Sequence, residues 1–359
     1  MLNICEHFVY CFISFNKNCS ILYSSQRSSH DANARPPAPL FGTDDLDAKL
    51  SDTDTFFTSF SGVFQGESLS PFLFSVFINV IEEELRAGNN GGITFENFVI
   101  SLILFADDMA LLSTSKQGLQ EGLNNLERYC DDWGLTVNTE KTKCMAFKKE
   151  GKMAVNDKWF FKGIQLETVP DFRYLGFTIG SSGSLSKGVS DLATRGSRAL
   201  FGLKRIISQN PALTVELQLN LFNSLVEPVM SYACESWGLR EADQLEKIHL
   251  AFLKSILGVR KSTPSAFIYR ELGVYPLILK RKIRVIKYWL KILSLSDQNP
   301  VKQMYNVLLS ELSTNDRTVN WASLVRDLLC EAGFGYIWFS QNSSNKSKLL
   351  HEPVQIHSV

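Results

Sequence analysis

Two adjacent acidic residues stand inside an apolar segment of the sequence. Asp107 and Asp108 occur in FADDMALL, between the apolar runs FVISLILFA and MALLS. Because a buried charge is costly unless it is paired or bound to a metal, such a pair can be part of a divalent-cation site. Phosphoryl transfer with two metal ions needs carboxylates that hold both ions close together. The alternative is a solvated Asp-Asp turn, which these two residues taken alone favour.

Three further segments carry residue types that suit nucleotide chemistry, and each has an ordinary structural alternative. In GVFQGESLSP, Gln65 can hydrogen-bond a base or sugar and Gly66 allows close backbone approach, but the segment can also be a plain loop before a helix. In GLTVNTEKTKC, Lys141 can neutralise a leaving pyrophosphate or donate a proton, whereas a solvated basic turn is the commoner outcome. In FRYLGFTI, Gly176 can admit a ligand or turn a hairpin.

Local patterns predict the elements that would hold these residues. The two apolar runs around Asp107 and Asp108 predict a β-hairpin with both acids at its turn. Ser70-Pro71 predicts a helix start. Apolar residues at intervals of three and four over residues 119–133 predict an amphipathic helix that ends before Gly134. The β-rich runs KCMAFK, KWFFK and FRYLGFTI follow, so strands and helices alternate in this segment, which is therefore α+β or α/β.

Three parts follow one another along the chain. Residues 1–54 show no clear period and are expected to be irregular. Residues 55–182 carry the mixed pattern, and residues 183–359 carry helical patterns. The expected helices of this last part are residues 185–208, 214–231, 243–257, 277–294 and 319–332.

The charge balance excludes a uniformly basic nucleic-acid binder but hides an asymmetry. The 359 residues fit about two domains, and the 45% hydrophobic and 21% charged residues are ordinary for a globular protein. The 37 Lys and Arg residues equal the 37 Asp and Glu residues. Residues 1–184, however, hold 15 basic and 23 acidic side chains, and the remainder hold 22 and 14. Two halves with net charges of −8 and +8 can mark a nucleic-acid or membrane contact.

Cysteine usage and hydropathy indicate where such a chain would reside. The seven cysteines form no CxxC pair and no Cys/His cluster with zinc spacing, which predicts a reducing compartment, cytoplasmic or nuclear. No run reaches the roughly 18 apolar residues of a membrane span. The apolar start lacks an early basic residue and is interrupted by Glu6 and His7, so we expect no signal peptide and no secretion.

The order and spacing of the four segments resemble the reverse transcriptases of non-LTR (LINE-type) retrotransposons. The resemblance covers roughly residues 55–180 as the palm and continues less sharply through residues 221–238 and 245–264. It implies an α+β fold, with a partial right-hand polymerase palm followed by an all-helical thumb-like region. The matching segments are Gln65-Gly66 with Leu69-Ser70-Pro71, Phe105-Ala106-Asp107-Asp108, Gly134-Leu135 with Asn138 and Lys141-Thr142, and Tyr174-Leu175-Gly176.

The resemblance also implies a reaction, in which a primer 3′-hydroxyl attacks a dNTP on an RNA template. The implied cofactor is a pair of Mg²⁺ ions, and the implied partners are an RNA template, a DNA primer and dNTPs. It implies no membrane partner and leaves the oligomeric state open. The implied roles are metal binding and catalysis for Asp107 and Asp108, proton donation for Lys141, the nucleotide and template pocket for Gln65 and Gly66, and the primer end for Phe105 and Ala106.

One element of the family pattern is not found in the sequence. A reverse transcriptase palm has a further catalytic aspartate on an earlier strand, in a segment resembling Asp-x-x-x-Ala-Phe-Asp. Asp31 lies in SSHDANARPP, and Asp44, Asp45 and Asp47 crowd FGTDDLDAK, neither of which is typical of a strand. We therefore expect the first core strand and the fingers to be absent, one side of the sheet to be uncovered, the metal site to be incomplete, and the chain alone to have little or no polymerase activity.

A basic stretch in the second half could hold nucleic acid. Between Lys254 and Lys291 there are ten basic residues and one acid, Glu271, with aromatic residues between them. Basic residues neutralise phosphates and aromatic rings stack on bases, although a solvated helix face is the alternative. Three hypotheses therefore stand: a truncated RNA-directed DNA polymerase domain, a non-catalytic nucleic-acid binder, or a functionless product of a decayed element. The predicted nucleic-acid contacts are Lys254, Arg260, Lys261, Lys280, Arg281, Lys282 and Arg284.

Overall fold

The chain divides into two compact units, which we call the sheet unit and the helical unit. The sheet unit comprises His7–Thr94 and Val99–Pro170, and the helical unit comprises Asp171–Val359 with Met1–Glu6 and Phe95–Phe98. The division at Asp171 falls before residue 182, where the sequence analysis places a boundary. The computed structural model describes residues 8–14, 47–49, 56–58, 68–82, 85, 92–95, 98–147, 157–315 and 317–341.

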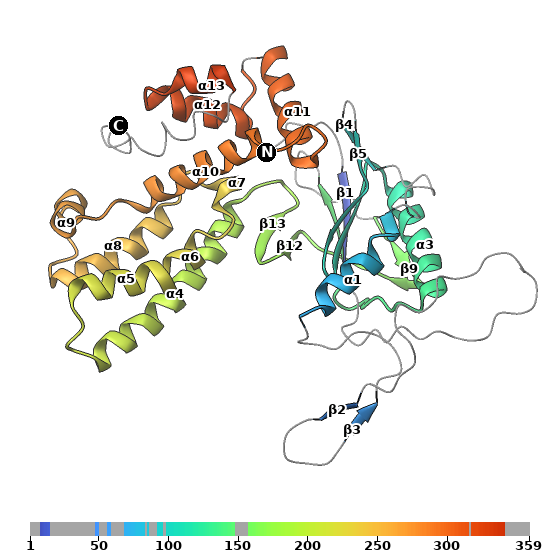
Figure 1. Ribbon diagram of the computed structural model, residues 1–359, viewed down its shortest axis with the longest axis horizontal. Coiled ribbons are helices and arrows are strands. Elements are labelled where there is room, and N and C mark those ends of the chain that lie inside the picture. The colour runs from blue at the N-terminus through green and yellow to red at the C-terminus, as the bar shows by residue number, and fades with distance from the viewer. Residues whose placement is uncertain are drawn as a thin grey trace, which may run out of the picture. The chain divides into compact units, whose positions relative to one another are not determined.

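The sheet unit is built on a five-stranded sheet that contains β1, labelled in Figure 1. The strand order of this sheet is β11-β8-β1-β7-β6. The pairs β1·β7, β1·β8 and β6·β7 are antiparallel, and β11·β8 is parallel. The strands of this sheet are β1 (Phe8–Ser14), β6 (Leu102–Phe105), β7 (Asp108–Ser113), β8 (Lys143–Phe147) and β11 (Glu167–Thr168). The unit's other elements are β2 (Asp47–Lys49), β3 (Phe56–Thr58), α1 (Ser70–Ile78), β4 (Ile93–Phe95), β5 (Phe98–Ile100), α3 (Lys116–Trp133), β9 (Phe160–Phe161) and β10 (Ile164–Gln165).

Strand β1 is the middle strand of the sheet, which contradicts the expectation that residues 1–54 are irregular and that the sheet lacks a core strand. Its register with β7 runs from Val9 opposite Ser113 to Ser14 opposite Asp108. Cys11, Phe12 and Ile13 are all buried, so both faces of β1 are covered. A strand buried on both faces is a continuous apolar run without alternation, and FVYCFIS therefore lacks the period that identifies a half-exposed strand.

Helix α3 covers one face of this sheet and confirms the amphipathic helix expected over residues 119–133. The Ser115 hydroxyl caps its first turn by accepting from the Gly118 backbone N–H at 3.0 Å. Gly134 ends the helix with φ of 64°, a left-handed value that suits glycine. The buried residues Leu119, Leu123 and Leu126 pack with alternate residues of β1, β7 and β8 in one hydrophobic core. This core fixes which face of each strand is turned toward α3.

The helical unit begins with the hairpin of β12 and β13, followed by packed helices (Figure 1). One hydrophobic core joins the hairpin to α4, α5, α6, α8 and α9, and a second joins α10 to α11, α12 and α13. The five predicted helices are present, with the second divided between α5 and α6. No helix within the described residues is long and apolar enough to cross a membrane. The elements are β12 (Asp171–Tyr174), β13 (Phe177–Gly180), α4 (Ser186–Gln209), α5 (Val215–Leu225), α6 (Glu227–Met230), α7 (Cys234–Trp237), α8 (Asp243–Leu257), α9 (Ser265–Leu272), α10 (Leu277–Leu293), α11 (Pro300–Thr314), α12 (Trp321–Glu331) and α13 (Gly335–Ser340).

Candidate polymerase site and nucleic-acid interface

The two adjacent aspartates lie at the turn between β6 and β7, as the sequence predicts. Phe105 pairs with Asp108 across the hairpin, which leaves Ala106 and Asp107 as the two turn residues. Ala106 has φ of 51°, a value that costs a non-glycine residue some strain. Both aspartates are half-buried, while Phe105 is 61% exposed. The hairpin therefore presents two carboxylates and an exposed ring at one end of the sheet.

Two other strands meet the hairpin at this end of the sheet, which we call the aspartate end. Strand β1 finishes here, because its last residue, Ser14, pairs with Asp108. Strand β8 starts here, because Lys143 pairs with Phe12, two residues before the end of β1. The aspartate end thus consists of Ser14, the Ala106–Asp108 turn and the residues that lead into β8. The sequence analysis did not predict strand β1, because residues 1–54 show no clear period.

The Asn138 turn brings Lys141 to the same end of the sheet. The Asn138 side-chain oxygen accepts from the Lys141 backbone N–H at 3.1 Å, and its carbonyl accepts from the Thr142 hydroxyl at 2.8 Å. Thr142 is buried, whereas the Lys141 side chain is exposed two residues before Lys143. Asn138 and Thr142 therefore build the turn, and Lys141 is the residue of this segment that is available to a phosphate.

The Tyr174-Leu175-Gly176 segment forms a hairpin turn in the helical unit. Leu175 and Gly176 are the two turn residues between β12 and β13, with φ of 46° and 85°, which is typical of a tight hairpin turn. The Leu175 carbonyl accepts a hydrogen bond from the Tyr232 hydroxyl, and the Gly176 carbonyl accepts one from the Arg195 guanidinium at 2.7 Å. Of the alternatives left open for Gly176, the hairpin turn is the one in the structure. The Gln65-Gly66 segment lies outside the described residues.

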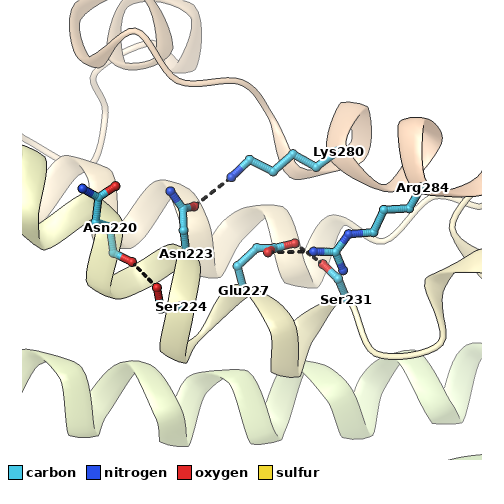
Figure 2. A network of polar contacts seen from close by, with 7 residues as sticks. All are labelled: Asn220, Asn223, Ser224, Glu227, Ser231, Lys280 and Arg284. Carbon is cyan, nitrogen blue, oxygen red and sulfur yellow. Dashed lines mark hydrogen bonds and ion pairs between the residues drawn. The ribbon is translucent and has the colours of Figure 1, made fainter. Parts of the chain in front are cut away.

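Several basic residues predicted to contact nucleic acid have partners inside the helical unit (Figure 2). Arg284 donates to the buried carboxylate of Glu227 at 3.0 Å, and the Lys280 ammonium donates to the Asn223 side-chain oxygen at 2.8 Å. Arg281 is 1% exposed, with its guanidinium 5.4 Å from the centre of the Trp237 ring. Because Arg281 is buried, a phosphate cannot reach it, and its assignment as a nucleic-acid contact is wrong.

The remaining predicted contacts keep some access to solvent. Arg260 and Lys261 are exposed, and Lys282 is half-buried. Lys254 is half-buried and its ammonium donates to the Lys261 carbonyl at 2.6 Å. Their role in binding nucleic acid stays a prediction.

Helix α4 carries an exposed basic and aromatic face that the sequence analysis did not select. Arg198, Phe201 and Arg205 follow one another at spacings of three and four, so they share one face of the helix. The Phe201 ring is 76% exposed, and both arginines are exposed. The sequence contains no acidic residue between Asp191 and Glu216. That gap in the acidic residues was the signal that could have revealed this face.

The donor set at the aspartate end does not fit a two-metal centre. Among the described residues, no three His, Cys, Asp or Glu side chains are grouped so that they could hold a metal ion. Two neighbouring carboxylates on one turn suit a single Mg²⁺ ion, which proteins usually bind through one or two carboxylates with waters at the remaining positions. A two-metal clamp needs further oxygens that bridge both ions, and the described residues supply no third carboxylate here.

Comparison with protein families agrees with the order of these motifs. Residues 40–179 match the family model described as reverse transcriptase (RNA-dependent DNA polymerase). This segment is a reverse transcriptase domain of the non-LTR, LINE type. It contains the β6–β7 hairpin with Asp107 and Asp108 and the turn at Asn138 and Lys141.

Several relatives of this reverse transcriptase domain come from insect mobile elements. The chain is 23% identical over 202 residues to the RNA-directed DNA polymerase from mobile element jockey of Drosophila melanogaster, covering 55% of this chain and 21% of that protein. It is 27% identical over 236 residues to the Pol polyprotein from type-1 retrotransposable element R2 of Popillia japonica, covering 62% of this chain and 32% of that protein. The matched region thus spans about a fifth to a third of these relatives' lengths.

Proposed function

We propose that the sheet unit is the palm of a retrotransposon RNA-directed DNA polymerase, and that the helical unit begins with its thumb-like region. The observation that carries this proposal is the aspartate end of the sheet. Asp107 and Asp108 lie there at the hairpin turn between β6 and β7. The last residue of the central strand β1 pairs with Asp108, and strand β8, which follows Lys141, begins at the same end. The reverse transcriptase match includes this hairpin.

The proposed substrates are an RNA template, a DNA primer and a dNTP. Phe105 is exposed beside the turn, where its ring can lie against a base at the primer end. Lys141 is exposed at the same end of the sheet and carries a positive charge suited to a triphosphate. The pocket roles of Gln65 and Gly66 remain predictions.

We expect the chemistry of this chain to be limited by its carboxylates. When Mg²⁺ ions are bound in such a site, they stabilise the charge that develops during nucleotidyl transfer. The two carboxylates of the aspartate end are too few for that arrangement, so Asp107 and Asp108 are expected to bind a divalent ion weakly.

Primer extension with the full chain tests this function. The assay uses an RNA template, an annealed DNA primer, dNTPs and Mg²⁺ or Mn²⁺, with the Asp107→Asn variant as the control. We expect trace extension from the unmodified chain and a loss of at least tenfold in Asp107→Asn, because a lost metal ligand removes charge neutralisation. Extension of equal rate in both proteins would contradict the proposed site.

A second candidate is nucleic-acid binding without catalysis, which the exposed face of α4 favours. Arg198 and Arg205 can neutralise phosphates, and the Phe201 ring between them can stack on a base. Template–primer binding by the same preparation, combined with no extension in any divalent ion, would support this candidate.

A further inference from the structure

Two buried cysteines face each other across strands β1 and β8. Cys11 and Cys144 are directly opposite in the register of this antiparallel pair, and both side chains are fully buried. The Cys144 thiol donates a hydrogen bond to Sγ of Cys11 at 3.4 Å. We propose that these two residues are a site of oxidative modification, at which a small-molecule disulfide of the glutathione type produces a disulfide bond between the central strand and β8.

The register of β1 brings the two thiols to the same face of the sheet. Five consecutive pairs join β1 to β8, and the Cys11–Cys144 pair is the fourth of them. Opposite residues of an antiparallel pair have Cβ atoms about 4.5–5.5 Å apart, close to the roughly 3.5–4.5 Å that a disulfide requires. The two sulfurs, 3.4 Å apart, need to approach by roughly 1.4 Å to form a bond. Small movements of the two side chains are therefore sufficient, and the strands keep their register.

The hydrophobic core around this pair separates it from solvent. Both cysteines belong to the core formed with α3, and Cys11 is also opposite Leu111 of β7. Burial, followed by the neighbouring Cys144 thiol, raises the pKa of Cys11 well above its ordinary value. Because the thiolate is the nucleophile in disulfide chemistry, the closed sheet slows the reaction, and oxidation takes place when the β1–β8 ladder opens or while the chain folds.

The modification consists of two successive thiol–disulfide exchanges. The thiolate of one cysteine attacks the glutathione disulfide, which forms a mixed disulfide and releases one glutathione thiolate. The thiolate of the other cysteine then attacks the protein sulfur of the mixed disulfide, which forms the Cys11–Cys144 bond and releases the second glutathione thiolate. The two cysteines thus lose two electrons and two protons, and these convert one glutathione disulfide into two glutathione thiols.

The separation of the two cysteines in the sequence gives the bond an effect on stability. Cys11 and Cys144 are 133 positions apart, so a bond between them closes a long loop and restricts the unfolded chain. In a reducing compartment the pair remains as two thiols, and the bond forms when the ratio of glutathione disulfide to glutathione thiol rises. Cys130 is a buried cysteine of the same core, on α3, and supplies a matched control.

Peptide mass mapping of the oxidised full chain tests the proposal. The chain is incubated in glutathione buffers of increasing disulfide content, at a urea concentration below its unfolding transition, and is then quenched with acid. We expect a peptide linked through Cys11 and Cys144, at least tenfold more abundant than any link that involves Cys130. This measurement uses the unmodified chain and does not depend on the folding of a variant. Absence of the 11–144 link, or equal yields of links to Cys130, would overturn the proposal.

Urea unfolding of the oxidised and reduced chains measures the effect of the bond. We expect the oxidised chain to unfold at a midpoint about 1 M higher than the same chain after treatment with dithiothreitol. Cys130→Ala should keep this difference, whereas Cys144→Ala should lose it. The same midpoint before and after reduction of a chain that carries the 11–144 link, or a difference that persists in Cys144→Ala, would contradict the stabilising role of the bond.

Discussion

Two glycines of helix α4 differ in how closely other residues pack against them. A Cβ on Gly188 would lie 2.3 Å from Cζ of Phe177 and 2.6 Å from the Thr178 carbonyl oxygen. A Cβ on Gly202 in the same helix would meet nothing within 4 Å. Gly188 therefore lets α4 approach the β12–β13 hairpin closely, whereas Gly202 has no packing role.

We expect Gly188→Ala to lower the free energy of unfolding by about 1–3 kcal/mol, because the Thr178 backbone cannot move aside without shifting the hairpin. The matched control Gly202→Ala should raise it by about 0.5–1 kcal/mol through helix propensity alone. Urea unfolding of both variants checks this pair. Equal effects of the two substitutions would contradict the close packing at Gly188.

Some residue roles could be predicted from the sequence and others could not. The turn position of Asp107 and the cap at Gly134 follow from local pattern, because turns and caps depend on neighbouring residues. The burial of Arg281 could not be predicted, since α10 carries six basic residues and the burial of this one depends on Trp237, a residue outside the helix. Tyr232 and Arg195 were missed as supports of the Leu175–Gly176 turn for the same reason.

At the scale of elements, the sequence predicts helices that have a regular hydrophobic period, and it misses a strand that is buried on both faces. Helices α3 and α10 have apolar stripes at intervals of three and four, and both are present as expected. Strand β1 has no alternation, and its pairing with β7 joins residues about 100 positions apart in sequence. Its place in the sheet is therefore a property of the tertiary structure.

Glu246 on α8 links three helices of the helical unit. Its carboxylate accepts from the Tyr269 hydroxyl on α9 and from the Leu277 backbone N–H on α10 at 3.1 Å. The His249 side chain lies 3.7 Å from the same oxygen. Burial by itself raises the pKa of Glu246, but His249 and the two hydrogen bonds outweigh it and hold the pKa below its ordinary value of 4.5.

The lowered pKa of Glu246 predicts a pH-dependent contribution to stability. Since the folded-state pKa lies below the unfolded one, the contribution is complete above pH 4.5 and is lost as the pH falls through the folded-state pKa. We expect Glu246→Gln to unfold more easily than the unmodified chain at pH 7, by about 1–2 kcal/mol, and this difference to shrink below pH 4.5. Urea unfolding of both proteins at a series of pH values measures it. A difference that stays constant with pH would contradict the role of the charge.

At the scale of the whole molecule, charge and fold divide at nearly the same place. Residues 1–184, with a net charge of −8, include the sheet unit and the start of the helical unit. Residues 185–359, with a net charge of +8, include the helices of the helical unit. Part of that positive charge is engaged internally, as at Arg284, or buried, as at Arg281. Exposed basic residues remain on α4 and around Arg260, and they are the surfaces that can neutralise phosphates.

The salt dependence of template–primer binding tests most directly whether this chain holds nucleic acid, which both proposed functions require. Fluorescence anisotropy of a labelled RNA–DNA hybrid gives log Kd against log salt concentration for the full chain. We predict binding that weakens steeply with salt, and a slope reduced by roughly 1.5 in Arg198→Ala/Arg205→Ala, because each phosphate contact contributes about 0.7–0.9. The comparison variant Arg260→Ala/Lys261→Ala should change the slope less. Absence of binding at low salt, or a slope unchanged by Arg198→Ala/Arg205→Ala, would contradict the account.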